Sequence, residues 1–400
     1  MQTWHYLDNS ATTPLCEEAK SAMLEAMEVF GNPSSLHGAG QEAARLLARA
    51  RACVANALGI SRPMPGELIF TSCGTEASNT ALIGTLLSGK HLAGRRVITT
   101  DCEHPSVENV MRRLEQDGFE VVRIGAPRGV LDTDAALAAL EIPTALVSLM
   151  MVNNETGARF DVERVFRAAK QKNPATFTHC DAVQGFLKVP FTAASLGADL
   201  ITVSGHKIHA PKGVGALYAR QGVILSSLIE GGAQERGKRA GTENIPGIMG
   251  MAAALEDACA HIPETSQKVS ALRDRLIQGL ARIPHGALNG DPVHRLPGNV
   301  SFCFEGVEGE SLLLLLDDKG ICASSGSACT SGSLDPSHVL LAIGRPHEVA
   351  HGSLRLTIAE DTTQADVDYI VASVTEVVEY LRNMSPLWKD KASGRKPFVI

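Results

Sequence analysis

Two charged residues in this sequence stand where an apolar run ends, a position from which a side chain can reach a ligand. Lys207 follows the run DLITVS (residues 199–204), and Asp181 follows the run TFTHC (176–180). A lysine amine can bond a carbonyl carbon as a Schiff base, and a lone buried carboxylate can keep a ring nitrogen protonated. Each alone has an ordinary explanation, as a surface lysine or a turn-capping aspartate, so the inference depends on their companions.

Further polar residues follow other runs of the same kind. The segment FTSCGTEAS (70–78) passes through Gly74 and Thr75 into a predicted helix, whose amino end can cradle a phosphate. His104 and Asn154 come after the runs RRVITT and TALVSLMMV. Ligands of open α/β sheets bind at the carboxyl ends of the strands, so we expect these groups to share one edge of a sheet.

An amine, a buried carboxylate, a phosphate cradle and a flat imidazole together match the requirements of pyridoxal 5'-phosphate. We predict that Lys207 bonds its aldehyde, that Asp181 faces its pyridine nitrogen and that His104 stacks on the ring. Asn154 and Gln184 are predicted to hydrogen-bond the ring hydroxyl. For His104 the alternative is a core histidine with its hydrogen bonds satisfied.

The elements that must position these groups alternate, from about residue 66 to 220, between short β-rich runs and amphipathic segments. Such alternation predicts an α/β fold, with a mostly parallel sheet covered by helices. The predicted strands are ELIF, RRVITT, FEVVRI, TALVSLMMV, TFTHC, DLITVS and GALYA, and the helices include ASNTALIGTLL, PSVENVMRRLEQ and VERVFRAAKQ.

A smaller α+β part is predicted beyond a long helical stretch that follows Gly247. Its strands and helices are indicated by NVSFCFE, ESLLLLLD, GSLRLTI and DVDYIVASVTEVVEYLRN. We place a large cofactor-binding domain at residues 15–260 and a small domain at 1–14 and 261–400. Residues 389–400 are expected to form a loose tail.

Three motif matches fail in their context. HEVAH (347–351) fits a zinc-protease motif, but Pro346 and Gly352 leave no room for the required helix, so a polar loop is expected there. GAGQEA (38–43) matches a dinucleotide fingerprint without a preceding strand, and GTLLSGKH (84–91) ends a helix where a P-loop would open one.

Composition favours a small soluble substrate. The net charge of −7 and pI near 6.0 provide no basic field for nucleic acid or an anionic membrane. No apolar run reaches the roughly 20 residues of a membrane span, and the start lacks the layout of a secretion signal, so a cytoplasmic protein is expected. The nine cysteines show no disulfide spacing, and Cys53, Cys180 and Cys259 are expected to be buried.

Long ordered segments also resemble one known family, the cysteine desulfurases of class V aminotransferase fold, most closely the NifS/IscS type of iron–sulfur cluster assembly. These segments are YLDNSATTP (6–14), GNPSSLHGAG (31–40), EHPSV (103–107), VNNETG (152–157), SGHKIHAPKGVGALY (204–218), GGAQERGKRAGTENIPG (231–247), SSGSACTSGSLDPSHVL (324–340) and HGSLRLT (351–357).

The resemblance implies a homodimer of fold-type I subunits with a seven-stranded-type sheet in the large domain. Lys207 matches the Schiff-base lysine, and Arg355 matches the residue that grips the substrate carboxylate. Thr242 matches the residue that reaches the phosphate of the partner subunit. Further cofactor contacts are implied for Gly74, Thr75, Asn154, Gln184, Ser204 and His206.

The resemblance also implies the reaction, in which L-cysteine yields L-alanine and its sulfur becomes a persulfide on Cys329. That cysteine lies in the glycine-rich and serine-rich segment SSGSACTSGS (324–333) of the small domain, which suits a movable carrier; the alternative is a tight turn with a buried thiol. The long form of this segment is similar to enzymes that pass sulfur directly to an iron–sulfur scaffold protein, where the carrier cysteine can transiently ligate the cluster.

Other functions stay open at this point. They are a different pyridoxal-phosphate enzyme, such as a selenocysteine lyase or an aminotransferase, and a non-enzymatic cluster scaffold using Cys329 and Cys322. The zinc peptidase of HEVAH is the third.

Overall fold

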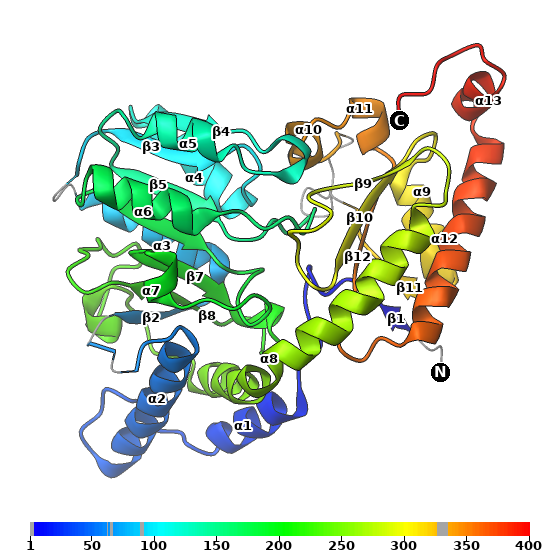
Figure 1. Ribbon diagram of the computed structural model, residues 1–400. Helices are drawn as coiled ribbons and strands as arrows, with labels where there is room; N and C mark the ends of the chain where they lie inside the picture. Colours follow the sequence, from blue (N-terminus) through cyan, green and yellow to red (C-terminus); the bar gives the residue numbers. More distant parts are fainter. Residues whose placement is uncertain (1–3, 62, 65–66, 89–91, 326–334) are drawn as a thin grey trace.

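The computed structural model describes residues 4–61, 63–64, 67–88, 92–325 and 335–400, so Cys329 lies outside the described residues (Figure 1). A seven-stranded sheet has the order β2-β8-β7-β6-β5-β3-β4, and every pairing in it is parallel except the two that β8 makes. The predicted mostly parallel sheet is therefore confirmed. Its strands are β2 (Leu68–Thr71), β3 (Arg96–Thr100), β4 (Glu120–Ile124), β5 (Leu146–Met150), β6 (Phe177–Asp181), β7 (Leu200–Ser204) and β8 (Gly215–Ala219).

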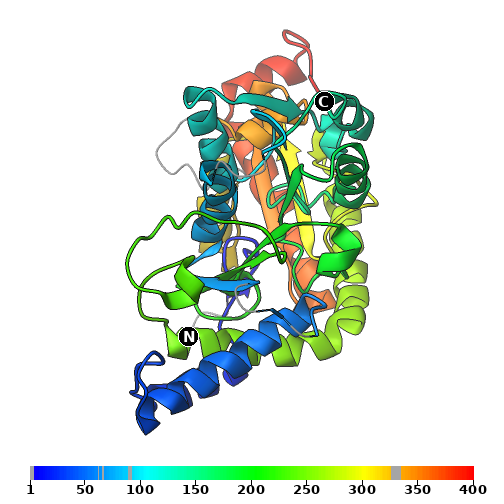
Figure 2. The same ribbon diagram turned by 90° about the vertical axis from the view of Figure 1, so that its left-hand side faces the viewer.

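Helices cover both faces of this sheet, as Figures 1 and 2 show. In α6, the buried residues Val162, Val165, Phe166 and Ala169 recur at helical spacing and form the stripe that faces the sheet. One face carries α3 and α4, and the other carries α5, α6 and α7. Their bounds are α3 (Gly74–Leu87), α4 (Pro105–Gln116), α5 (Thr133–Ala139), α6 (Val162–Lys172) and α7 (Ala193–Leu196).

The strand register brings several strand ends to one edge. Thr71 and Ser204 both pair with Gly215, and Met150 pairs with Asp181. A Cβ atom on Gly215 would lie 2.7 Å from the carbonyl carbon of Cys73, so glycine is needed for this close approach. The loops after β2, β3, β5, β6 and β7 therefore leave the sheet together, as the sequence predicted.

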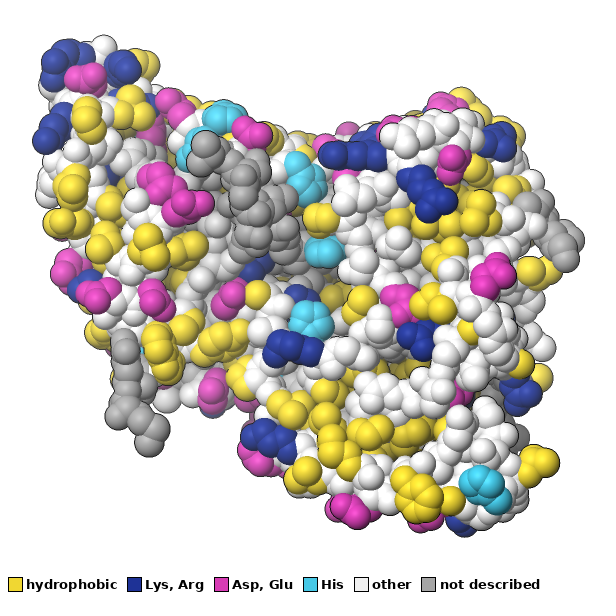
Figure 3. Space-filling model, turned by 180° about the vertical axis from the view of Figure 1, so that it is seen from behind, with side chains coloured by type: hydrophobic (Ala, Val, Ile, Leu, Met, Phe, Trp, Pro, Cys, Tyr) yellow, Lys and Arg dark blue, Asp and Glu magenta, His cyan; other side chains and the backbone are white. Residues whose placement is uncertain are grey.

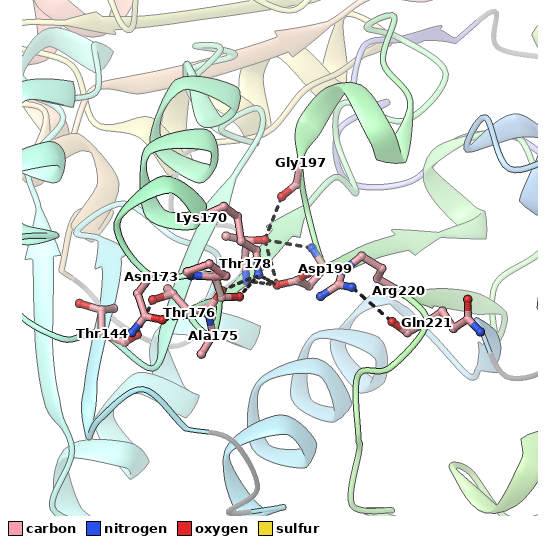
Figure 4. A network of polar contacts seen from close by, with 11 residues as sticks. Thr144, Lys170, Asn173, Ala175, Thr176, Thr178, Gly197, Asp199, Arg220 and Gln221 are labelled. Atoms are coloured by element: carbon pink, nitrogen blue, oxygen red, sulfur yellow. Dashed lines mark hydrogen bonds and ion pairs between the residues drawn. The ribbon is translucent and has the colours of Figure 1, made fainter.

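The opposite edge of the sheet is closed by a buried carboxylate (Figure 4). The Asp199 side chain is 1% exposed; one of its oxygens accepts from Arg220 Nε at 2.6 Å, and the other accepts from Lys170 and from the Thr178 amide. The network joins α6 and the starts of β6 and β7 to the end of β8. Because two cations and an amide surround Asp199, the cost of burying its charge is offset.

A second part of the molecule contains two small sheets. An antiparallel sheet has the order β12-β10-β9, and the N-terminal strand β1 pairs in parallel with β11. These elements have their own apolar core with α9, α12 and the end of α8. The bounds are β1 (His5–Tyr6), β9 (Gly286–Leu288), β10 (Asn299–Phe304), β11 (Ile321–Cys322), β12 (Ser353–Thr357), α9 (Gly309–Asp318), α10 (His338–Ala342), α11 (His347–Ala350), α12 (Gln364–Met384) and α13 (Pro386–Ala392).

The long helix α8 (Ile245–Leu280) joins the two parts and confirms the predicted helical stretch (Figure 1). It packs against α1 (Glu17–Met27) and α2 (Gly38–Ala57) on one side and against α12 on the other. The predicted domain boundary at residue 260 falls inside this helix, close to Pro263, and stays a prediction. Within the part of the chain that the structure describes, no helix combines the length and apolar character of a membrane span.

The expected loose tail is wrong, because the C-terminal segment packs against the small part. Lys391 is 4% exposed and lies between the carboxylates of Glu305 and Glu348, and Glu305 also accepts from the Val399 and Ile400 amides. Ile400 packs against the apolar cluster that contains Cys303, and the Phe398 ring stacks on His285, contacts that the charged letters of this segment do not reveal.

Two smaller expectations are also corrected. Residues His347–Ala350 form the short helix α11, not a polar loop, and its Val349 and Ala350 are buried. This helix is still far shorter than a zinc-protease helix. Cys259 is exposed and Cys53 half-buried, whereas Cys180 is buried as expected.

Lys391→Ala is predicted to lower the free energy of unfolding by about 3 kcal/mol, because Glu305 is left buried without its lysine. Urea unfolding followed by circular dichroism measures the loss. The matched control is Lys389→Ala, an exposed position on the same helix. Equal stability of both variants would contradict the packed tail.

Candidate active site

A pocket of about 330 Å³ lies at the edge where the strand ends meet. The side chains that the sequence singled out converge here from five strand ends, from the short turn after β7 and from β12. The predicted residues that line it are Gly74, Thr75, His104, Asn154, Asp181, Gln184, Ser204, His206, Lys207 and Arg355. The structure brings ten predicted residues together, and their individual roles stay predictions.

Lys207 is held by the N-terminal segment. Its Nζ donates to the carbonyl oxygens of Ser10 at 2.7 Å and Ala11 at 2.6 Å. The Gln184 side-chain amide donates to the same Ser10 carbonyl at 2.9 Å. Sequence reasoning missed Ser10 and Ala11 because they act through backbone carbonyls, which no side-chain pattern reports.

His104 caps the amino end of α4 and faces the pocket as a neutral ring. Its Nδ1 accepts from the Ser106 amide at 3.1 Å, so the proton of the neutral ring is on Nε2. Burial lowers the pKa of His104 to about 4, and repulsion from Lys207 and His338 acts in the same direction. The sequence also allowed His104 to be a core histidine with its hydrogen bonds satisfied. That description fits His179 instead, because both nitrogens of His179 lie within hydrogen-bonding distance of buried hydroxyls.

Asp181 provides the buried carboxylate. Burial raises its pKa to about 6, while a hydrogen bond from the Val183 amide and the charge of Lys207 oppose that rise. The group is therefore ionised at neutral pH, and a cationic partner in the pocket would stabilise it further.

Four buried polar atoms of the pocket residues have no hydrogen-bond partner within the described chain. They are Asn154 Oδ1, Gln184 Oε1, Ser204 Oγ and Arg355 Nε. Native proteins rarely leave such atoms unsatisfied, because each costs about 1–3 kcal/mol. Their convergence on one pocket indicates a polar ligand.

Arg355 forms the wall between the two parts of the molecule. Its Nη2 donates to Asp8 at 2.8 Å and its Nη1 to the Asn154 carbonyl at 3.2 Å. Its backbone pairs with Ser324, just before the undescribed residues that contain Cys329. Arg355 thus connects the pocket to the small part of the molecule.

Three predicted residues stand apart from the rest. His206 lines the pocket but points its Nδ1 to Thr12 Oγ1 at 3.3 Å, and burial lowers its pKa to about 4. Thr242 is exposed and does not line this pocket, and its role at a partner subunit stays a prediction. Cys329 lies outside the described residues. Cys73 and Ser106 line the pocket and were missed.

The sheet order, the pocket at its carboxyl edge and the α+β second part define the fold of the fold-type I pyridoxal-phosphate-dependent transferases. The profile described as "Aminotransferase class-V" matches residues 5–370. A curated relative, "Cysteine desulfurase IscS" of Methanosarcina thermophila, is 47% identical over 384 residues, which are 96% of this chain and 94% of that protein.

Solved structures agree. One, described as "NIFS-LIKE PROTEIN", has a TM-score of 0.87 at 36% identity and covers 94% of this chain and 100% of that chain. Another, "SspA in complex with cysteine", has a TM-score of 0.77 at 29% identity, with 90% and 100% covered. The chain belongs to the class-V aminotransferase family and, within it, to the cysteine desulfurases.

The ring of His104 is predicted to titrate near pH 4 in cofactor-free protein, measured by NMR with His104→Gln to assign its signal. An unfolded histidine binds its proton at about pH 6.5. The unfolded state therefore holds more protons between these values, and the contribution of His104 to stability is lost as pH falls from 6.5 toward 4. A midpoint near 6.5 would contradict the effect of burial on this ring.

Proposed function

We propose that this protein is a cysteine desulfurase that uses pyridoxal 5'-phosphate to remove sulfur from L-cysteine, giving L-alanine and a persulfide on Cys329. The observation that carries the proposal is the set of unsatisfied polar atoms around Lys207 and Asp181 in one pocket. Membership of the cysteine desulfurases, within the class-V aminotransferase family, identifies the reaction as desulfuration and not as amino transfer.

The pocket residues fit the cofactor in chemistry and in space. Gly74 and Thr75 open α3, whose amide groups and dipole suit a phosphate. A Cβ atom on Gly74 would lie 3.0 Å from Val183 Cγ2 and 3.2 Å from Ser204 Cβ, so the backbone of Gly74 already packs closely against these two side chains. Asn154 and Gln184 keep free acceptor oxygens that a ring hydroxyl can reach, and Asp181 suits a protonated ring nitrogen.

Bound pyridoxal phosphate supplies an aldehyde that bonds amines and a ring that accepts electrons from the neighbouring carbon. Lys207 would hold the aldehyde, and its amine, once released, would be the base that moves the α-proton of L-cysteine. The Ser10 and Ala11 carbonyls fix that amine at the pocket wall. His104, neutral at pH 7 with its proton on Nε2, would hold the ring through its flat face.

Substrate recognition is assigned to Arg355 and Asn154. The Arg355 guanidinium is buried, keeps an unused Nε–H and presents a planar fork that matches a carboxylate. The related protein of "SspA in complex with cysteine" binds cysteine, which supports L-cysteine as the ligand here. A salt bridge to Asp8 holds the arginine in place.

Sulfur transfer is assigned to Cys329. Its thiolate attacks the substrate sulfur, the S–S bond forms as the C–S bond breaks, and the carbon keeps the electron pair and takes a proton. The persulfide then passes its outer sulfur to an iron–sulfur scaffold or another acceptor protein in the cytoplasm. Cys329 can ligate the cluster transiently during that transfer.

A homodimer is proposed as the active form. Thr242 lies outside its own pocket and is assigned to the phosphate of the partner subunit. Large apolar side chains lie exposed around α1 and α2, among them Phe30 at 89% and Leu36 at 91% exposure, and Figure 3 shows apolar side chains gathered on this end of the molecule. Such exposure is typical of a covered surface, and sedimentation analysis tests it.

Gly74→Ala is predicted to weaken pyridoxal phosphate binding by about tenfold or more, because the added methyl forces Val183 or Ser204 toward the phosphate cradle. Absorbance titration of cofactor-free protein measures the affinity. The matched control is Gly38→Ala, since Gly38 also opens a helix and an added Cβ there meets nothing within 4 Å. Equal affinity of the two variants would count against the cradle.

Cys329→Ala is predicted to abolish alanine and persulfide formation, by about a thousandfold or more, while the cofactor absorbance stays that of the wild type. Alanine is assayed by chromatography and the persulfide by mass spectrometry. The matched control is Cys259→Ala, an exposed cysteine on α8. Retained alanine formation in Cys329→Ala would remove Cys329 from the mechanism.

A further inference from the structure

A second cavity, of about 80 Å³, lies where the two parts of the molecule meet. Its walls come from the N-terminal segment, the loop after β6, the middle of α8 and the residues around the end of β12. It shares no lining residue with the proposed active site. A role for this cavity therefore does not rest on the proposed function.

Two residues that line this cavity carry polar atoms for which the described chain provides no hydrogen-bond partner. They are Lys188 Nζ and Asn9 Oδ1, and both atoms are buried. Asn9 is 5% exposed, and its Nδ2 donates to the Thr357 carbonyl at 2.8 Å, which leaves Oδ1 as an unused acceptor. An unpaired buried ammonium is costlier than any neutral group, so this pair requires an explanation.

The charges around Lys188 do not supply its partner. Glu360 lines the same cavity and attracts the ammonium, but its side chain is half exposed and lies 3.7 Å from His209 Nε2. Lys207, at the neighbouring pocket, repels it. Burial and this repulsion together lower the pKa of Lys188 to about 8.

The remaining walls limit the size and charge of an occupant. Apolar and polar side chains share these walls, and about 80 Å³ corresponds to roughly three water molecules or one ligand of about four non-hydrogen atoms. Because the Glu360 carboxylate lines the same cavity, it repels a dianion more than a monoanion, whose single charge Lys188 can neutralise. The apolar lining residues are Leu187, Ile262, Val269, Leu296, Pro297 and Ile358.

We propose that this cavity is a binding site for a small oxygen-bearing monoanion with a hydrogen-bond donor, of the size of hydrogencarbonate. Lys188 donates to the anionic oxygens, and the hydroxyl of the ligand donates to Asn9 Oδ1. Asn9 directly precedes Ser10 and Ala11, whose carbonyls hold Lys207, so an occupant stabilises the segment that fixes this amine.

The test is thermal unfolding of the holoenzyme with increasing sodium hydrogencarbonate, at an ionic strength kept constant with gluconate, which is too large for the cavity. The unfolding temperature of the wild type is expected to rise with a saturable dependence on hydrogencarbonate. Formate, which lacks the hydroxyl, is expected to bind at least threefold more weakly.

Variants separate this cavity from the active-site pocket. Lys188→Met is expected to lose the shift, and Arg355→Lys, altered in the other anion-binding pocket, is expected to keep it. Because the lysine must be an ammonium, the affinity is expected to fall as pH rises above about 8. No shift in the wild type, an unchanged shift in Lys188→Met or a loss confined to Arg355→Lys would overturn the proposal.

A second measurement needs no variant, should Lys188→Met fail to fold. Crystals of the wild-type holoenzyme soaked in bromide, a monoanion visible by anomalous scattering, are expected to show a peak beside Lys188 Nζ. A cavity filled by water only would overturn the assignment.

Discussion

Unsatisfied hydrogen-bonding atoms at one edge of the large sheet are the constraint on which the structure depends. Asn154, Gln184 and Ser204 are buried there at the strand ends, and a bound ligand would offset the cost of their desolvation. The strand register cannot shift to satisfy them, since a slip of one residue would turn every side chain of a buried strand to the other face. The pocket is therefore organised before any ligand enters, which reduces the cost of binding.

At the opposite edge of the same sheet, a buried carboxylate has its partners within the protein itself. There Asp199 is equally buried but is surrounded by Lys170, Arg220 and the Thr178 amide. The N-terminal segment links the two parts of the molecule, because it pairs with strands of the small part and at the same time holds Lys207. The small and large parts are thus joined at Lys207, the proposed Schiff-base lysine.

The sequence predicted the large sheet well, because short strand-like runs alternate with amphipathic helical segments along this part of the chain. It also predicted ten pocket residues, since strand ends of parallel sheets meet at one edge. The contacts of Ser10 and Ala11 were missed because they are made by backbone carbonyls. The packed tail was missed because Lys391 reads as a surface residue until Glu305 is seen beside it. The cavity at Lys188 depends on segments far apart in the chain, which no local pattern brings together.

The central claim, that this pocket holds pyridoxal phosphate through Lys207, is tested most directly by covalent trapping. The holoenzyme is reduced with sodium borohydride, digested and analysed by mass spectrometry. The account predicts the phosphopyridoxyl mass on the peptide that contains Lys207, with the label absent from Lys188 and from the exposed Lys212. A label on either of those lysines, or no stoichiometric label on any lysine, would contradict it.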